Sequence, residues 1–354
     1  MVSFINNKNF IYYKNLDSSK PKIAGFDLDH TIISPKHSIF PKDENDWKYT
    51  FSDMKEKILE LSKDYNIVIF SNQKQYNRNS NIIISRINKF IIDLGIPVTI
   101  FLSINDDNYR KPNIGLWEFL ETYIDTDKSS SFFVGDAAGR VYSNTFKDFS
   151  ASDYKFALNV GIDFKTPQQL LNLPDNYKYI DIDTLPFQQI KTLSIDHFIH
   201  PQIKHTHELV ILVGLPCVGK TTFKHKFFNS YLALNSDIKL DEKTLKNYIK
   251  KQNIIVDGCN HTIKKRKKIL DIAKKNNVNV RCFYFNIDKQ IALHLNNYSM
   301  KVYNTVKKNK ISFTNIEKKM ELPNIEEGFE NIEFVNFVPI FTNPNNKKLF
   351  YQHS

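Results

Sequence analysis

Residues 23–34 read IAGFDLDHTIIS, an apolar run that ends in two carboxylates placed one residue apart. Alternate side chains of a strand face the same way, so this spacing predicts that Asp27 and Asp29 lie on one side of the chain. Two carboxylates at that separation repel each other unless a cation or a shared proton lies between them. The pair is therefore typical either of the polar start of a loop or of a magnesium-dependent site for phosphoryl transfer.

Four short apolar runs in the first half of the chain follow a strand pattern and alternate with helical patterns. The runs are KIAGFDL, NIVIFSN, VTIFLSI and SSFFVGD, and segments such as FSDMKEKILELSKDY lie between them. This alternation predicts a parallel α/β sheet, whose functional residues gather at the carboxyl ends of the strands. A second alternation begins at ELVILVGLPCVGKTTF, residues 208–223, and predicts a second sheet of the same class.

The length of 354 residues exceeds that of one ordinary domain, and the two alternating patterns predict two domains. We expect a first domain over residues 1–172, a linker over 173–206 and a second domain over 207–354. The histidines in and beside the linker fit either a metal cluster or solvent-exposed positions, and their spacing matches no known metal site, which favours exposure. These histidines are His197, His200, His205 and His207.

Composition narrows the class of protein. The formal net charge of +11 favours a polyanionic partner such as nucleic acid, although a general excess of lysine gives the same value. The three cysteines form no CxxC pair, which argues against a disulfide framework and fits a reducing compartment. Neither a signal peptide nor a membrane-spanning run is visible. We expect an intracellular monomer without a membrane partner, in the nucleus or another compartment that holds DNA.

Polar residues at the ends of later strands favour the phosphoryl-transfer interpretation of Asp27 and Asp29. Ser71 ends the next apolar strand, Lys111 precedes a helical pattern, and Asp136 follows a third strand. A nucleophilic carboxylate, a hydroxyl, a lysine and a distant acid are the groups that transfer through an aspartyl-phosphate requires. Singly, these residues fit a helix cap, a surface lysine and a turn, but the ordered set favours a site.

Five segments give residues 22–170 a resemblance to the haloacid-dehalogenase-like phosphatases and, more narrowly, to the phosphatase domain of the polynucleotide kinase 3′-phosphatase family. They are AGFDLDHTI, IFSNQ, YRKPNIGLWEFL, FFVGDAAGR and KDFSASDYKFALNVGIDFKTPQQL. The resemblance implies a Rossmann-like domain in which Asp27 attacks a 3′-phosphate and Asp29 protonates the leaving oxygen, then activates water. It also implies that Mg²⁺ is held by Asp27, the Asp29 carbonyl and Asp136. The implied phosphate-binding residues are Ser71 and Lys111. His30 stands where the family usually has glycine, at a position that shapes the turn.

Residues 214–221, GLPCVGKT, match the phosphate-binding pattern GxxxxGK[ST] between a strand pattern and a helical pattern. The glycines let backbone N–H groups turn toward phosphates at the start of the helix. Lys220 is expected to reach the β- and γ-phosphates of ATP, and Thr221 to bind Mg²⁺. The predicted ATP site is the whole loop: Gly214, Leu215, Pro216, Cys217, Val218, Gly219, Lys220 and Thr221. Cys217 fits a tolerated filler better than a redox switch.

The same family resemblance extends through this second half, in the eukaryotic order of phosphatase before P-loop kinase. It implies that Asp237, in LNSDIKL, is the general base that deprotonates a 5′-hydroxyl. VDGCNHT, with Asp257 and Asn260, and EEGFENIEFVNF match further segments of the family. The forkhead-associated domain that animal members carry is not expected.

The second half departs from the family where arginines are expected. The base region reads SDIK, and the lid region HLNNYSMKVYN has Tyr298 and Met300 in place of arginines. An arginine beside a transferring phosphoryl group contributes about 10³- to 10⁵-fold in rate, and lysine is a poor geometric replacement. Lys239 and Lys301 are the candidates for partial compensation.

The run IKKRKKIL, residues 263–270, places five cations together at residues 264–268. It fits a phosphate-backbone or nuclear-localisation segment, or the solvated face of a helix. Flanking apolar residues at helical spacing favour the helix face.

Three functions follow from these patterns. The leading hypothesis is a bifunctional enzyme of DNA strand-break repair that removes 3′-phosphates and phosphorylates 5′-hydroxyl ends with ATP and Mg²⁺. The second is a 3′-phosphatase whose degenerate kinase domain only binds nucleotide or nucleic acid. The third is a non-catalytic module that binds nucleic-acid ends. The ordered set of polar residues in the first half argues against the third, and the missing arginines separate the first from the second.

Overall fold

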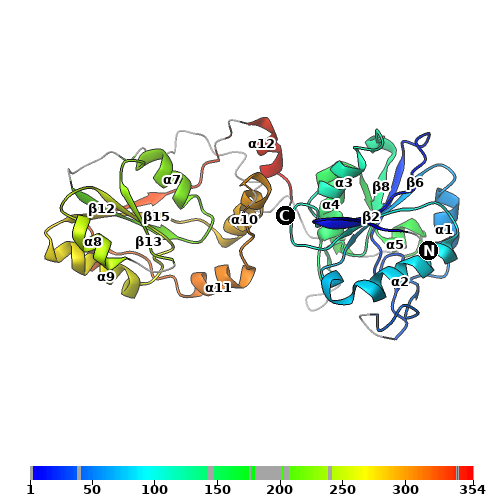
Figure 1. Cartoon of the computed structure of the whole chain (residues 1–354), viewed down its shortest axis with the longest axis horizontal. Coiled ribbons are helices and arrows are strands. Elements are labelled where there is room, and N and C mark those ends of the chain that lie inside the picture. The colour runs from blue at the N-terminus through cyan, green and yellow to red at the C-terminus, as the bar shows by residue number, and fades with distance from the viewer. Residues whose placement is uncertain are drawn as a thin grey trace. The chain divides into compact units, whose positions relative to one another are not determined.

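The computed structural model of the chain (Figure 1) consists of two compact units. One is formed by Met1–Asp181 with Gln352–Ser354, and the other by Ile182–Tyr351. The structure describes residues 3–37, 41–141, 147–174, 177–179, 201, 207–237, 241–303, 305–339, 341 and 343–353. Each unit is built on a largely parallel sheet, so the predicted pair of α/β domains is confirmed at the level of fold class.

The sheet of the first unit has the strand order β1-β2-β7-β6-β3-β8-β10. Its parallel strands are β3 (Ile23–Phe26), β6 (Asn66–Asn72), β7 (Thr99–Ser103), β8 (Phe132–Val134) and β10 (Asp163–Lys165). At one edge, β1 (Ile5–Asn7) and β2 (Phe10–Tyr13) add an antiparallel hairpin. The helices are α1 (Met54–Leu61), α2 (Tyr76–Leu94), α3 (Gly115–Leu120), α4 (Ser152–Val160) and α5 (Pro167–Leu170).

Helices cover both faces of this sheet (Figure 1), which explains why its central strands are apolar throughout. In β3, Ala24 and Phe26 pack on the face that α1 and α2 cover. Ile23 points to the opposite face and joins the core formed with α3 and α4. Because the helices occupy both faces, the carboxyl ends of the parallel strands are left as the place where polar side chains can meet.

Short strands complete the first unit. They are β4 (Ile33–Ser34), β5 (Lys48–Tyr49), β9 (Arg140–Val141) and β11 (Lys178–Tyr179). Because β11 pairs antiparallel with β9, it belongs to the first unit although it lies within the predicted linker, 173–206. Most of that linker, with His197, His200 and His205, lies outside the described residues.

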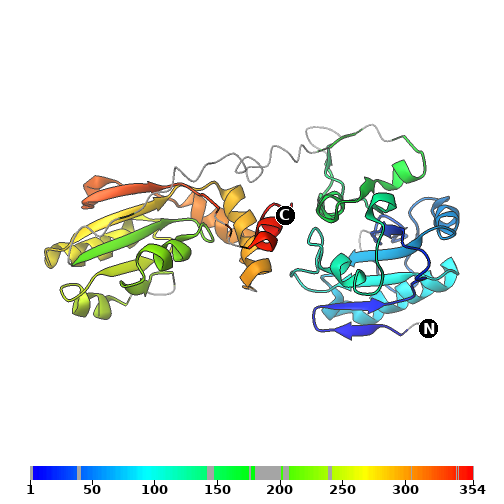
Figure 2. The same ribbon diagram turned by 90° about the horizontal axis from the view of Figure 1, so that it is seen from above.

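The second unit has the order β13-β14-β12-β15-β16, and every neighbouring pair is parallel. The strands are β13 (Leu232–Asn235), β14 (Ile254–Asp257), β12 (Glu208–Gly214), β15 (Asn279–Phe285) and β16 (Asn331–Val335) (Figure 2). The helices are α7 (Lys220–Phe227), α8 (Glu242–Tyr248), α9 (Ile263–Lys275), α10 (Lys289–Tyr303), α11 (Lys310–Lys318) and α12 (Pro344–Phe350). Leu209 and Ile211 of β12 face α8 and α9, whereas Val210 and Leu212 face α7, α10 and α11.

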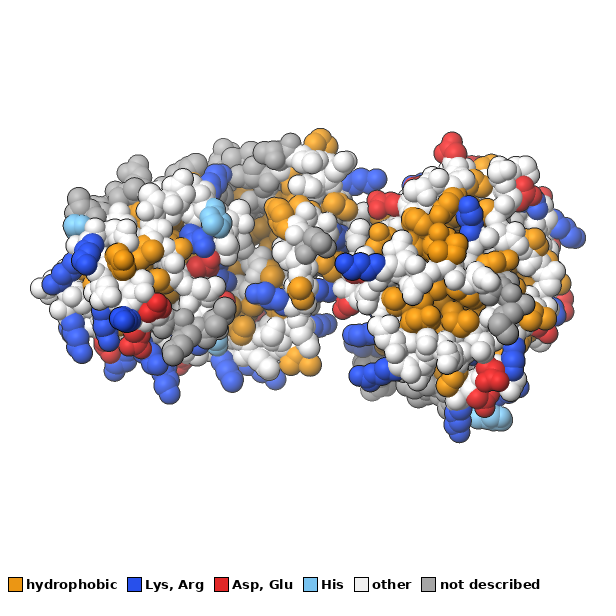
Figure 3. Space-filling view, in the orientation of Figure 1, with side chains coloured by type: hydrophobic (Ala, Val, Ile, Leu, Met, Phe, Trp, Pro, Cys, Tyr) orange, Lys and Arg blue, Asp and Glu red, His pale blue; other side chains and the backbone are white. Residues whose placement is uncertain are grey.

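The basic run lies at the start of α9 and serves two ends. Lys264, Lys265, Lys267 and Lys268 are exposed, and Figure 3 shows lysines gathered over α8 and α9. Arg266, by contrast, is fully buried, and its Nη2 lies 2.7 Å from Oε1 of Glu327. The run therefore exposes four lysines around one structural arginine, an arrangement that fits both a solvated helix face and a segment that binds a phosphate backbone.

The three cysteines are all free. Among the described residues, no helix has both the length and the apolar character that a membrane span needs.

Candidate active sites

A buried lysine joins two carboxylates at the carboxyl edge of the first sheet. The backbone N–H of Asp27 donates to the Val134 carbonyl at 2.8 Å, which extends the β3–β8 pairing and fixes where the side chain begins. Lys111 Nζ lies 2.7 Å from Oδ1 of Asp27 and 2.7 Å from Oδ1 of Asp153. All three residues are buried, so these ion pairs are shielded from water.

Asn72, at the end of β6, holds Lys111 in place. Its Oδ1 accepts the Lys111 backbone N–H at 3.0 Å, and its Nδ2 donates to the Lys111 carbonyl at 3.2 Å. The loop that carries the lysine is thereby tied to the strand next to Asp27. Ser71, the residue before Asn72, is buried at the same strand end and accepts a hydrogen bond from Gln73 Nε2 at 2.8 Å.

Asp29 points into a different set of partners from Asp27. Arg86 Nη2 lies 2.7 Å from its Oδ1, and Gln73 Nε2 donates to its Oδ2 at 2.6 Å. The turn between the acids and the rest of the loop places His30 at φ +62°, a conformation that glycine adopts most readily. Both carboxylate oxygens of Asp29 are thus oriented by side chains that are distant in the sequence.

Asp136 completes a cluster of three acids. Its Oδ1 accepts from Thr31 Oγ1 at 3.1 Å, and its backbone N–H donates to the same hydroxyl at 2.9 Å. One oxygen each from Asp27, Asp136 and Asp153 lies within 4.8 Å of the other two. Three crowded carboxylates offer the hard oxygen ligands that Mg²⁺ prefers, so the residues present fit a divalent cation.

Burial and the neighbouring charges shift the pKa values of the residues in this cluster. Burial raises the pKa of Asp27 well above its ordinary value, against the opposing effect of Lys111. Burial and the nearby Asp153 carboxylate raise the pKa of Asp136 to about 6. Burial alone would lower the pKa of Lys111, but Asp153 and Asp27 raise it overall. Burial and the neighbouring acids thus disfavour the charged forms of Asp27 and Asp136, and a bound cation would favour them again.

Sequence reasoning missed Asp153, Arg86 and Gln73. Asp153 lies in the first turn of α4, where an acidic residue is ordinarily explained by the helix dipole. Its approach to the site needs a glycine, because a Cβ on Gly135 would lie 2.4 Å from the Asp153 Cβ. A usable signal existed only for Arg86, a lone cation on the apolar stripe of α2 between Ile83 and Ile87.

In the second unit, the predicted phosphate loop joins β12 to α7. Cys217 and Gly219 have positive φ angles of +64° and +92°, which turn the backbone before Lys220 begins the helix. Lys220 Nζ donates to the carbonyl of Gly214 at 3.0 Å and to that of Leu215. Burial lowers the pKa of this lysine. The Lys220 ammonium thus binds carbonyls of its own loop, and the loop has the curved backbone of a phosphate-binding site.

Two acids from neighbouring strands face this loop. Thr221 Oγ1 donates to Oδ2 of Asp257, at the end of β14, at 2.9 Å. A loop hydroxyl beside such an acid is the arrangement that holds Mg²⁺ in P-loop enzymes. Asp237, which follows β13, accepts the Cys259 backbone N–H at 2.7 Å and is exposed to solvent. The Asp237 carboxylate, the predicted base, is thus oriented by one hydrogen bond and remains accessible to a substrate from the solvent.

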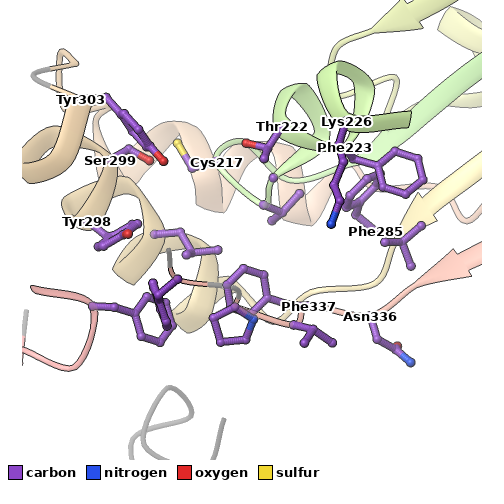
Figure 4. Close-up of a pocket in the computed structure, with 18 of the residues that line it drawn as sticks. Cys217, Thr222, Phe223, Lys226, Phe285, Tyr298, Ser299, Tyr303, Asn336 and Phe337 are labelled. Atoms are coloured by element: carbon purple, nitrogen blue, oxygen red, sulfur yellow. The ribbon is translucent and has the colours of Figure 1, made fainter. Parts of the chain in front are cut away.

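A largely apolar pocket of about 350 Å³ adjoins the phosphate loop (Figure 4). Cys217, Gly219 and Thr222 line it on the loop side. Aromatic rings from α7, β15, α10 and the C-terminal segment form most of the remaining wall, among them Phe223, Phe285, Tyr298, Tyr303, Phe337 and Phe341. Its size and lining suit a flat heteroaromatic group.

The two residues that replace the expected lid arginines are packed against their neighbours and bring no positive charge to the site. Met300 is buried, and the ring of Tyr298 packs 5.5 Å from that of Phe350, centroid to centroid. Of the two lysines considered as compensation, Lys301 lies in the last turn of α10, and Lys239 lies outside the described residues.

Known proteins with similar sequences cover most of the chain. A sequence model for the family described as polynucleotide kinase 3 phosphatase matches residues 22–171. The bifunctional polynucleotide phosphatase/kinase of Schizosaccharomyces pombe is 32% identical over 343 residues, which cover 92% of this chain and 82% of that protein. A protein of Acanthamoeba polyphaga mimivirus, provisionally given the same name, is 31% identical over 380 residues, covering 92% and 88%.

A third relative matches a smaller part of the chain. The polynucleotide 3′-phosphatase of Saccharomyces cerevisiae is 29% identical over 212 residues, which cover 42% of this chain and 87% of that protein. The matches to the two longer relatives run through both units. The family resemblance predicted from the sequence is confirmed, and the chain belongs to the bifunctional polynucleotide phosphatase/kinase family.

Proposed function

We propose that this enzyme heals nucleic-acid ends: the first unit hydrolyses 3′-phosphates, and the second transfers the γ-phosphate of ATP to 5′-hydroxyls. Membership of the family supports both reactions. The observation that carries the phosphatase half is the buried Lys111, which bridges Asp27 and Asp153 within a cluster of three acids. The finer expectations, DNA as the substrate, a monomer and a reducing compartment that holds DNA, stay predictions.

In the phosphatase reaction, Asp27 attacks the phosphorus of the 3′-phosphate and the bond from phosphorus to the 3′-oxygen breaks. Asp29 gives its proton to that oxygen and later takes a proton from the water that hydrolyses the aspartyl-phosphate, so inorganic phosphate leaves and the enzyme is restored. Lys111 and Ser71 bind the oxygens of the transferred group.

Mg²⁺ would be held by Asp27, Asp136, Asp153 and the Asp29 carbonyl. When bound, it neutralises the acids and the charge on the phosphoryl group. The carboxylate cluster supports this assignment.

A polynucleotide substrate is supported by an aromatic side chain beside this site. Phe149 is 96% exposed, which is unusual for phenylalanine. Its neighbours are anchored next to Asp136: Arg140 donates to the Asp148 carboxylate at 2.9 Å and to the Asp136 carbonyl at 3.2 Å. An exposed ring at this place is available to stack on a base at the strand end.

In the kinase reaction, the phosphate loop and Lys220 bind the ATP phosphates, and the aromatic pocket takes the base. Thr221 and Asp257 would hold Mg²⁺. Asp237 removes the proton of the 5′-hydroxyl, whose oxygen then bonds to the γ-phosphorus as the bond to ADP breaks.

The test uses a gapped DNA duplex with 3′-phosphate and 5′-hydroxyl ends, Mg²⁺ and labelled ATP. Wild type is compared with Asp27→Asn and Lys220→Met, and with Asp125→Asn as a control at an exposed acid. We expect wild type to convert both ends and each active-site variant to lose only its own reaction. Loss of 3′-phosphate without 5′-labelling by wild type would leave a phosphatase alone, and conversion of neither end would reject both activities.

A further inference from the structure

The segment between α10 and α11 is tied to the phosphate loop through one buried side chain. Asn296, on α10, accepts the Lys308 backbone N–H at 3.0 Å and donates to the Lys308 carbonyl at 2.9 Å. The same Oδ1 accepts a hydrogen bond from Cys217 Sγ at 3.6 Å. Asn296 is only 3% exposed, so these hydrogen bonds are buried and shielded from water. The backbone of Lys308 is therefore one side chain away from the fourth residue of the phosphate loop.

The charge of Lys308 acts beside the phosphate loop, because it opposes the rise that burial causes in the pKa of Cys217. At the first residue of the loop, the Gly214 backbone N–H donates to the Cys259 carbonyl at 3.1 Å. The Cys259 backbone N–H in turn donates to the Asp237 carboxylate at 2.7 Å. Lys308 and the proposed base Asp237 are thus each joined to the phosphate loop through one intervening residue.

We propose that Lys308 is the cation that stabilises the phosphoryl group during its transfer. This lysine lies in the segment between α10 and α11, whose sequence contains no arginine. The inference rests on the proposed kinase function and names a residue for it. In the reaction the bond from the γ-phosphorus to ADP breaks, the bond to the 5′-oxygen forms, and Asp237 takes the hydroxyl proton. Lys308 keeps its proton throughout and offsets the charge on the three equatorial oxygens.

The structure explains why the cation would come from Lys308 and not from the positions on α10 where arginines were expected. Met300 is buried in the helix packing, and Tyr298 is engaged with the ring of Phe350. Lys308 lies beyond the helix, is exposed, and has its backbone clamped at both its N–H and its carbonyl. An exposed ammonium on a fixed backbone can turn toward a bound nucleotide without a buried charge in its absence.

The test measures single-turnover kinase rates of the full chain at saturating ATP for Lys308→Met and Lys308→Arg. Lys310→Met, at an exposed lysine two residues away, is the control. We expect Lys308→Met to lower the rate at least about 10-fold, below the 10³- to 10⁵-fold effect of an arginine finger because lysine lacks the fork geometry. Lys308→Arg should match or exceed wild type, and Lys310→Met and all phosphatase rates should stay within twofold.

A second readout separates transition-state charge from loop structure. ADP alone and ADP with aluminium fluoride, a mimic of the transferring group, are titrated against wild type and Lys308→Met. We expect the variant to bind ADP as wild type does and to lose about 10-fold or more of its affinity for the mimic. An unchanged rate and unchanged mimic binding in a kinase-active wild type would overturn the inference alone. A wild type without kinase activity would instead reject the proposed kinase function.

Discussion

The Arg86 guanidinium on α2 forms an ion pair with Asp29, with 2.7 Å between Nη2 and Oδ1. Arg86 is fully buried, and its Nε and Nη1 have no hydrogen-bond partner among the described residues. A buried arginine with two unpaired nitrogens lowers the stability of the fold, so its contact with the acid is maintained at the expense of stability. Gln73 directs the other oxygen of Asp29 from the end of β6. Together, they act as positioning residues for the acid that is proposed to transfer protons.

Arg86→Met should lower the single-turnover rate on 3′-phosphorylated oligonucleotides about 10²-fold, within the range of general acid catalysis. The loss should be much smaller on p-nitrophenyl phosphate, because its leaving group departs without a proton. Arg86→Lys should recover part of the rate, and the melting temperature identifies variants that fail to fold. Equal losses on both substrates in a folded variant would show that Arg86 does not act through Asp29.

Asp153→Asn should raise the Mg²⁺ concentration for half-maximal phosphatase activity about 10- to 100-fold, because it removes a charged oxygen from the acid cluster and a partner from Lys111. A Mg²⁺ titration of the phosphatase rate checks this, with kinase activity as an internal reference. Asp163→Asn, at an exposed acid of the same unit, is the control. A titration curve that matches wild type would remove Asp153 from the metal site.

Phe149→Ala should raise KM for a 3′-phosphorylated oligonucleotide about 5- to 160-fold, since stacking of one base contributes about 1–3 kcal/mol. Its rate on p-nitrophenyl phosphate should not change, because that substrate has no base. Phe149→Trp should restore binding. If alanine leaves the oligonucleotide KM unchanged, the exposed ring has no part in strand binding.

N-ethylmaleimide should modify Cys217 before the other cysteines, and ATP should slow that reaction. Cys217 is half-buried, whereas Cys259 and Cys282 are buried. Burial raises the pKa of all three thiols, to about 11 for Cys259 and about 12 for Cys282, so these two stay protonated near pH 7. Since the thiolate is the nucleophile, their slow rates should rise about tenfold per pH unit below those values. Mass spectrometry of peptides from the full chain follows each site. Labelling of Cys217 that ignores ATP would argue against nucleotide at the phosphate loop.

Arg266→Met should destabilise the second unit by about 3 kcal/mol, because it leaves the buried Glu327 carboxylate unpaired. Alanine at Lys264, Lys265, Lys267 and Lys268 together should change stability little, since all four are exposed. Urea unfolding of the full chain measures both. The quadruple variant also tests strand binding: weaker binding with a shallower salt dependence would assign the lysines to a phosphate backbone, and unchanged binding would leave them as a solvated face.

The sequence by itself determined the two parallel sheets and the places where functional groups begin. Strand and helix periods, the spacing of Asp27 and Asp29, and the phosphate loop at 214–221 are local patterns. They depend on neighbours a few residues away, and parallel topology then carries strand-end residues to one edge of a sheet. This is why Lys111 and Asp136 could be expected near Asp27 without a structure.

Tertiary packing alone decided which distant side chains complete those sites. Asp153 reaches Lys111 because Gly135 lets α4 approach, and Arg86 reaches Asp29 because α2 buries the face that carries it. The clamp of Asn296 on Lys308 depends in the same way on how α10 packs beside the phosphate loop. Such contacts join residues far apart in the chain through burial and close approach, and no local period or spacing encodes them.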